Sequence, residues 1–243
     1  MKKSILIAAL WIAVLASATA NASTIGVLDD YGNEYNNIST FYTSQGQTVY
    51  ALADNFTAGQ INGSKLLVLT LFNTLGSSQL SALDSYVNGG GRLLLNSDGN
   101  GFQYYQGNVN AILSSLGSSM VNVNGAYDSG YHVTTNILAN PFTAGVSSIL
   151  YGYTSALTGG TGLVLGVGGQ DFISYQAIGP GYVFVIADSN TGDGLNQPTY
   201  GNQQLYLNFL NATSSTTPEP GTLVMFGSGI IGLAGVLRRK INL

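Results

Sequence analysis

Two strongly apolar segments that flank a helical pattern constrain the fold of this chain more than any other feature. Residues 65–72 (KLLVLTLF) and 92–96 (RLLLN) are nearly continuous apolar runs, which are typical of strands covered on both faces of a sheet. Between them, Ser77 or Ser78 is suited to cap a helix that ends at the glycines 89–91. The apolar side chains that share one face of this helix are Leu80, Leu83, Tyr86 and Val87. A strand, a helix and a strand at this spacing predict a βαβ crossover between parallel neighbours.

The remaining sequence extends this unit into an α/β domain. We expect strands at residues 24–28 and 47–52, helices within 33–46, 108–117 and 203–211, and three strands within 161–190. Tight glycine turns join the last three strands and predict an antiparallel hairpin at one edge. Residues 120–153 predict irregular structure with short strands. This order of elements predicts a mostly parallel sheet flanked by helices, the α/β class.

The first 22 residues have the pattern of a secretory signal peptide. Lys2 and Lys3 form a basic start, residues 5–15 are apolar, and Ala20 and Ala22 occupy the small positions before a cleavage site. The alternative is a retained membrane helix, but the apolar run is shorter than a bilayer requires. We therefore expect cleavage after Ala22 and an exported mature chain.

A second apolar segment lies close to the other end of the chain. Residues 222–237 carry no charge, and as a helix they would span roughly 24 Å, just short of the ~30 Å hydrocarbon core. The bases that follow are Arg238, Arg239 and Lys240. Such a cluster stays on the cytoplasmic side, so the preceding domain would face outward. We expect a globular domain at 23–212, a linker at 213–221, one transmembrane helix at 222–237 and a basic tail at 238–243.

Residues 217–240 (TPEPGTLVMFGSGIIGLAGVLRRK) resemble the PEP-CTERM sorting signal of Gram-negative bacteria. The matching features are the triplet Pro218–Glu219–Pro220, a single apolar helix and the basic cluster, in that order. The resemblance implies transient residence in the inner membrane, and recognition and cleavage near the triplet by an exosortase. It also implies use of the secretion machinery and delivery to the cell surface or the extracellular polysaccharide matrix. The alternative is an ordinary single-pass anchor that follows a chance Pro-Glu-Pro.

The composition of the mature segment excludes several classes of function. Residues 23–216 contain ten acidic side chains and only two bases, Lys65 and Arg92, a net charge of −8. Nucleic-acid binding needs clustered cations that displace phosphate counterions, and this segment has no such cluster. The chain contains no cysteine, which excludes disulfides, thiol nucleophiles and cysteine metal sites. Packing must therefore supply the stability of an exported domain.

A second resemblance covers most of the globular segment. Residues 75–99, 140–146 and 173–190 together resemble a class I glutamine amidotransferase-like domain, which has a flavodoxin-like fold. In that superfamily a helix ends in Gly-Gly before a central strand. A late hairpin with a Gly-x-Gly turn, here Gly179–Pro180–Gly181, leads into a strand that ends in Asp. These are markers of the fold and not of its catalysis, so the resemblance implies an architecture alone.

The catalytic position of that superfamily is altered in this chain. Its amidotransferases carry a cysteine on the turn after the central strand, where this sequence has Asn96, Ser97 and Asp98. Ser97 could attack a carbonyl if a base such as His132, the only histidine, stood beside it. The alternative is that Ser97 and Asp98 satisfy backbone groups in a tight turn and that His132 is a polar residue of a strand.

Two polar loops contain candidate calcium ligands. They are Asn96, Asp98 and Asn100 in the first loop and Asp188, Asn190 and Asp193 in the second. The first loop has the spacing that opens an EF-hand, although Gly107 stands where the bidentate acid is expected. Both loops, with Asp29 and Asp30, are expected at the carboxyl edge of the sheet, where open α/β sheets bind ligands. The alternative is that both loops are solvated turns.

The same edge is a candidate surface for polysaccharide. Carboxylates there could hydrogen-bond sugar hydroxyls beside the rings of Tyr31, Tyr104 or Tyr105. Other tyrosines, including Tyr42 and Tyr86, have the spacing of core residues and need no ligand.

The sequence thus predicts an exported, non-enzymatic surface or matrix protein with a structural or polysaccharide-associated role. The alternative is an extracytoplasmic hydrolase or amidotransferase relative that acts on a carbohydrate or an amide. An enzyme would bring His132 within hydrogen-bonding reach of Ser97 or Asp98, whereas a binding module would show an open acidic edge with exposed tyrosines.

Overall fold

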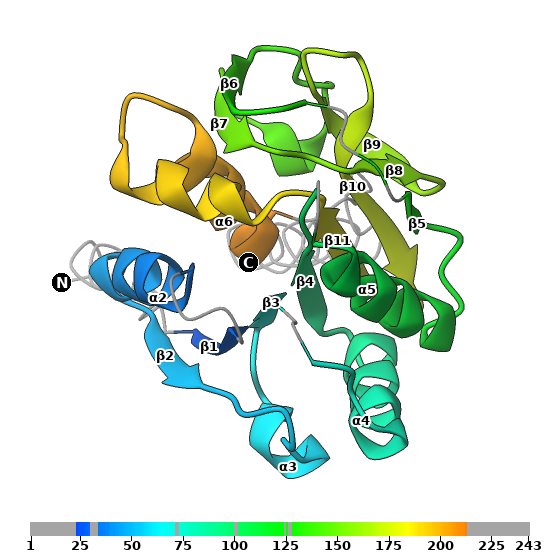
Figure 1. Cartoon of the computed structure of the whole chain (residues 1–243). Helices are drawn as coiled ribbons and strands as arrows, with labels where there is room; N and C mark the ends of the chain where they lie inside the picture. Colours follow the sequence, from blue (N-terminus) through cyan, green and yellow to red (C-terminus); the bar gives the residue numbers. More distant parts are fainter. Residues whose placement is uncertain are drawn as a thin grey trace, which may run out of the picture.

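The computed structural model of the chain describes residues 23–29, 34–70, 73–99, 102–123, 125 and 128–212. A seven-stranded sheet in the order β2-β1-β3-β4-β11-β10-β9 forms its centre (Figure 1). Its strands are β1 (Thr24–Asp29), β2 (Thr48–Ala51), β3 (Leu66–Thr70), β4 (Arg92–Asn96), β9 (Thr161–Leu165), β10 (Asp171–Ile178) and β11 (Gly181–Ile186). The predicted signal peptide, linker, transmembrane helix and tail lie outside the described residues. Within the part of the chain described, no helix has the length and apolar character needed to cross a membrane.

Five neighbouring strands of this sheet pair in parallel, and β10 is the one strand of the sheet that runs in the opposite direction. The pairs β2–β1, β1–β3, β3–β4 and β4–β11 are parallel, while β10 is antiparallel to both β11 and β9. The five parallel strands follow the order 2-1-3-4-5 of flavodoxin-like folds. The predicted mostly parallel sheet with a late antiparallel hairpin is confirmed.

Helices cover the sheet on both faces. Helices α2 (Glu34–Ser44) and α6 (Asn202–Asn211) lie on one face, while α4 (Ser77–Asn88) and α5 (Gln103–Ser115) lie on the other, with the short α3 (Ala58–Ile61) beside α4 (Figure 1). Two small antiparallel ribbons complete the domain. They pair β5 (Val121–Val123) with β8 (Ala156–Thr158) and β6 (Tyr131–Thr134) with β7 (Ile149–Gly152). Short 3-10 helices, η1 (Pro141–Thr143) and η2 (Ser189–Asn196), connect these parts.

The core explains why the central strands lack an alternating pattern. Every residue of β3 and β4 is buried, because helices cover both faces of the sheet at its centre. On the α6 face the ring of Phe184 lies 4.9 Å from that of Phe142 and 4.6 Å from that of Phe209, measured between centroids. Tyr42 is fully buried and donates to the carbonyl of Tyr206 at 2.9 Å, so its prediction as a core residue is confirmed.

Two local predictions differ from the structure, and one short helix was not predicted. Gly76, not Ser77 or Ser78, occupies the N-cap of α4, and no side chain caps this helix. Helix α5 begins at Gln103, before the expected 108–117 segment, because the buried Tyr105 extends the apolar face of Val109 and Ile112 by one turn. The short α3 follows a capping box formed by Thr57 and Gln60, a signal that the sequence contains but that apolar periodicity does not show.

The two bases of the domain hold the end of α6. The Arg92 guanidinium, at the start of β4, donates to the carbonyls of Phe209 (2.7 Å) and Ala212. Lys65, just before β3, donates from Nζ to Asn211 Oδ1 at 2.9 Å. Cations at a helix C-terminus satisfy free carbonyls and oppose the negative end of the helix dipole. Residue 212 therefore lies at the amino edge of the sheet, the edge at which β3 and β4 begin.

Replacement of Asn202 by alanine should destabilise the domain strongly. The fully buried amide of Asn202 accepts from the Leu150 amide (2.9 Å) and donates to the carbonyls of Leu150 (2.8 Å) and Thr191 (2.9 Å). Because three buried backbone groups lose their partner, we expect the free energy of unfolding to fall by on the order of 3 kcal/mol. Urea denaturation of Asn202→Ala measures this, with Gln203→Ala, a partly exposed neighbour, expected to cost less than about 1 kcal/mol.

Candidate functional site

The polar residues at the carboxyl edge come from two adjacent loops. Asn96 ends β4 and pairs with Ile186, which ends the parallel neighbour β11. The Ser97 amide continues this contact by donating to the Ile186 carbonyl at 2.7 Å. The loop after β4 is thus brought beside the loop that carries Asp188, as the parallel order of the strands requires.

Asp98 is buried between these loops, and both of its carboxylate oxygens accept hydrogen bonds from the protein. Its Oδ2 accepts from the Ser189 hydroxyl at 2.6 Å and its Oδ1 from the Gly99 amide at 2.7 Å. Burial raises the pKa of Asp98 to about 6, although both hydrogen bonds act in the opposite direction. The carboxyl group therefore exchanges its proton near neutral pH while it joins the two loops.

Asp188 is fully enclosed and plays a similar part. Its Oδ2 accepts from the Gly152 amide of β7 and its Oδ1 from the Asn190 amide, both at 2.9 Å. Burial raises the pKa of Asp188 well above the ordinary value, and the nearby Asp98 raises it further. The side chain caps η2 and ties the β6–β7 ribbon to the central sheet.

The candidate nucleophile Ser97 is closed off from solvent. Its side chain is fully buried and its hydroxyl has no hydrogen-bond partner among the described residues. The neighbouring Asn96 donates from Nδ2 to the Thr70 hydroxyl at 3.1 Å, across to β3, and its Oδ1 likewise has no partner there. Ser97 and Asp98 are therefore together in the fold, but a substrate would need the edge to open before it could reach the hydroxyl.

His132 belongs to a different part of the edge. It lies on β6, its Nε2 donates to the Ser129 carbonyl at 2.9 Å, and its ring centroid is 5.7 Å from that of Tyr151. Within the described residues, no hydrogen bond joins His132 to Ser97 or Asp98. The arrangement thus brings together two members of the hypothetical triad and leaves the third engaged elsewhere.

The candidate calcium ligands are divided in the same way. Asn100 lies outside the described residues, and the carboxylates of Asp98 and Asp188 are turned inward to the contacts above. Asn190 and Asp193 take part in a surface hydrogen-bond network. Across the described ranges, no group of three or more histidine, cysteine or acidic side chains is placed to hold a metal ion. Calcium binding stays a prediction, to be tested by titration.

An ordered aromatic surface lies at this edge, and the sequence did not single it out. Tyr131 on β6 is 56% exposed, and its hydroxyl donates to Asp193 Oδ2 at 2.9 Å and accepts from Asn190 Nδ2 at 3.2 Å. Asn37 Nδ2 lies 3.3 Å from Asp193 Oδ1, and Asn196 Nδ2 donates to Asn37 Oδ1 at 2.7 Å. We call these five residues the Tyr131 network. Partial burial, followed by the contact with Asp193, raises the Tyr131 pKa to about 12.

Tyr153 stands beside this network in an unusual conformation. It is 41% exposed, and its ring lies edge-on to that of Tyr131, with centroids 6.3 Å apart. Its φ of 57° is the one left-handed value among the non-glycine residues described. Its carbonyl packs so closely on Gly99 that a Cβ at that position would collide with the oxygen. Such conformations cost of order 1–3 kcal/mol and cluster at functional sites.

The three tyrosines that the sequence suggested for sugar binding have different positions. Tyr104 on α5 is 62% exposed, Tyr105 is buried, and Tyr31 lies outside the described residues. Alternation within β6, where Tyr131 and Val133 are exposed and Thr134 is buried, was the one available signal for Tyr131. That strand is too short for the signal to be recognised in the sequence.

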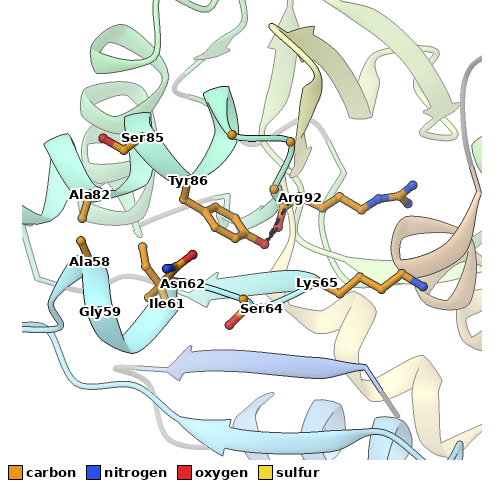
Figure 2. Close-up of a pocket in the computed structure, with 14 residues that line it drawn as sticks. Ala58, Gly59, Ile61, Asn62, Ser64, Lys65, Ala82, Ser85, Tyr86 and Arg92 are labelled. Carbon is orange, nitrogen blue, oxygen red and sulfur yellow. Dashed lines mark hydrogen bonds between the residues drawn. The ribbon is translucent and has the colours of Figure 1, made fainter. Parts of the chain in front are cut away.

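A pocket of 720 Å³ lies at the opposite, amino edge, between α3 and α4 (Figure 2). The ring of Tyr86 stands in it, and the Tyr86 hydroxyl donates to the Arg92 carbonyl at 3.0 Å. Ala58, Ile61 and Ala82 supply apolar walls. None of these residues was a candidate in the sequence.

Comparison with known proteins places the end of the chain in a defined class. Residues 216–240 match the family model of the PEP-CTERM protein-sorting motif. The chain carries a PEP-CTERM sorting motif. The motif implies export, a membrane-anchored precursor and an exosortase as the processing partner. Among curated proteins, none matches the chain in sequence.

Solved structures show the fold of the globular part. A β-galactosidase from Rahnella sp. R3 superposes with a TM-score of 0.55 at 13% identity over 81% of this chain, which spans 33% of that enzyme. A protein described as one component of a GMP synthase, from Thermoplasma acidophilum, gives 0.53 at 12% identity, covering 78% of this chain and 92% of that one. A ThuA-like protein from Bacteroides uniformis gives 0.50 at 12% identity, covering 80% and 94%. The amidotransferase-like architecture is confirmed, and at these identities the likeness shows the fold alone.

Stability should depend on pH through Asp98. The folded protein keeps the Asp98 proton up to about pH 6, whereas the unfolded chain loses it near pH 3.8. The stability that depends on a protonated Asp98 is therefore fully present below pH 3.8 and is lost as the pH rises through 6. The free energy of unfolding falls by on the order of 3 kcal/mol over this range. Asp98→Asn keeps the Gly99 contact without the charge, so its stability relative to wild type should rise between about pH 4 and pH 7. Urea denaturation at both pH values measures this, and the partly exposed Asp54→Asn should show no such change.

Proposed function

We propose that this protein is an exported, non-catalytic component of the cell surface or extracellular matrix of a Gram-negative bacterium, and that its carboxyl edge binds polysaccharide. In this proposal a signal peptide (1–22) and a sorting helix (222–237) with a basic tail (238–243) deliver the domain at 23–212. The linker at 213–221 is where the exosortase separates the domain from its membrane anchor.

The Tyr131 network is the observation that carries the binding role. Exposed tyrosine rings offer apolar faces to the C–H surface of a sugar, while fixed carboxylate and amide groups match its hydroxyls. The network is tied across α2, η2 and β6 by hydrogen bonds between the side chains of Tyr131, Asp193 and Asn37, so little ordering would be needed on binding. The acidic composition of the domain disfavours polyanions and supports a neutral glycan as the ligand.

Two contacts argue against catalysis at the amidotransferase position. Asp98 is used to join the two loops, and His132 is hydrogen-bonded to the Ser129 carbonyl. The alternative, an extracytoplasmic hydrolase or amidotransferase-like enzyme, is favoured by one observation: among the described residues, the Ser97 hydroxyl has no partner and lies next to a carboxyl group of raised pKa. A loss of measurable hydrolysis in Ser97→Ala, with unchanged stability, would support that alternative.

Removal of both exposed rings should strongly weaken glycan binding. We expect the double variant Tyr131→Ala and Tyr153→Ala to bind neutral polysaccharide at least about tenfold more weakly than wild type, because both stacking surfaces are lost. Affinity electrophoresis in gels that contain the polysaccharide measures this. Val121→Ala, which truncates an exposed apolar side chain on β5, is the matched control. A wild-type protein that binds no member of a neutral glycan panel would contradict the proposed function.

Processing should remove both ends of the chain. Protein recovered from the surface of an exosortase-containing host should begin at Ser23 and end close to Pro218–Glu219–Pro220, as measured by mass spectrometry of the intact protein. Replacement of Pro218 and Pro220 by alanine should leave the C-terminal segment attached, while Ser214→Ala should be processed normally. Surface-exposed wild-type protein with an intact C-terminus would refute exosortase cleavage.

A further inference from the structure

Lys65 and Arg92 form an isolated pair of cations in an acidic domain. They are the only bases in residues 23–216. Burial lowers the pKa of Lys65 and the neighbouring Arg92 lowers it further. No carboxylate perturbs the pKa of either residue, and within the described residues neither has an acidic partner at hydrogen-bonding distance. Two like charges held together without a counter-charge favour an anion between them.

The pair is fixed in place but retains unused donors. Arg92 is 8% exposed, lies over the Tyr182 ring, and uses Nη1 and Nη2 for the carbonyls of Phe209 and Ala212, which leaves part of its fork of five N–H groups. Lys65 has a single hydrogen bond from Nζ within the described residues, to Asn211, and remains largely accessible. The two side chains extend from the pocket at the amino edge toward the end of α6 (Figure 2).

The pocket beside the pair has the chemistry of a groove for proline. The Tyr86 ring is the single aromatic group of its lining, Ile61 and Ala82 supply apolar surface beside it, and much of the remaining lining is glycine. Aromatic-lined grooves bind extended proline-containing segments because these lose little conformational entropy on docking. An acidic segment with proline on both sides would match the pocket and the cations together.

This chain contains such a segment close by. Ala212, whose carbonyl is held by Arg92, is followed by residues 213–220 (TSSTTPEP), and Glu219 is the only acidic side chain after Asp193. Glu219 lies seven positions beyond Ala212, a reach of at most about 25 Å. A connection this short gives an effective concentration in the millimolar range, enough to favour a contact that would be weak between separate molecules.

We propose that residues 213–220 fold back onto the amino edge, with the Glu219 carboxylate against Lys65 and Arg92 and the flanking prolines in the pocket lined by Tyr86. The globular domain then holds the sorting triplet in a fixed position in the uncleaved precursor. This proposal concerns the precursor and is independent of glycan binding.

Zero-length coupling tests the contact directly. Carbodiimide treatment of the full-length precursor in detergent micelles should join Lys65 Nζ to the Glu219 carboxylate as an amide, with water lost to the reagent. Peptide mass spectrometry identifies the product. Glu219→Gln and Lys65→Arg should each abolish it, and Asp54→Asn, the same charge change after the carboxyl end of β2, should not. Coupling of Lys65 only to other carboxylates, or to Glu219 only between two molecules, would overturn the proposal.

The reactivity of Lys65 gives a second, independent readout. Acylation of Lys65 by an amine reagent should become about two- to fivefold faster in Glu219→Gln, because a partly exposed ion pair protects the amine only modestly. The same increase is expected when Pro218 and Pro220 are replaced by alanine, and none is expected in Asp54→Asn. An unchanged rate in Glu219→Gln would argue against the contact even if the coupled product formed.

Discussion

The complete burial of the two central strands is the constraint on which the rest of this structure depends. Because β3 and β4 have apolar side chains on both faces, the sheet offers no polar surface at its centre. Charged and hydrogen-bonding side chains are therefore concentrated at the two ends of the strands. The carboxyl edge receives the acidic loops after β4 and β11, and the amino edge receives Lys65 and Arg92. The domain thus has two chemically opposite poles, and the sorting segment continues from the basic one.

The buried carboxyl groups at the carboxyl edge stabilise the fold through hydrogen bonds. Asp98 and Asp188 each accept two hydrogen bonds and join loops from different strands. Their burial raises the pKa of both carboxyl groups. An exported domain without disulfides gains cohesion from such buried polar links, which are costly to break. The Tyr131 network is also joined across elements, but it lies at the surface and its ring, that of Tyr131, is exposed to solvent.

Apolar patterns and glycine stops were sufficient to predict the strand–helix–strand unit, the late hairpin and the closing helix, because strands buried on both faces, such as β3 and β4, consist of nearly continuous apolar residues. The edge was less predictable. Whether Ser97 points into the core or into a cleft depends on the loop after β11, which lies far away in sequence. In the same way, the exposure of Tyr131 depends on pairing with β7, and a four-residue strand carries too little periodicity to reveal it.

The hydrogen bonds from Arg92 to the carbonyls at the end of α6 also have a mechanical consequence. Tension applied to the membrane-side end of the chain would pass through Ala212 and Phe209 into β4, which has neighbouring strands on both sides. Such a load is shared by two ladders of backbone hydrogen bonds, whereas a helix without this attachment would unwind one turn at a time. The attachment therefore couples the end of α6, and the chain that follows it, to the centre of the sheet.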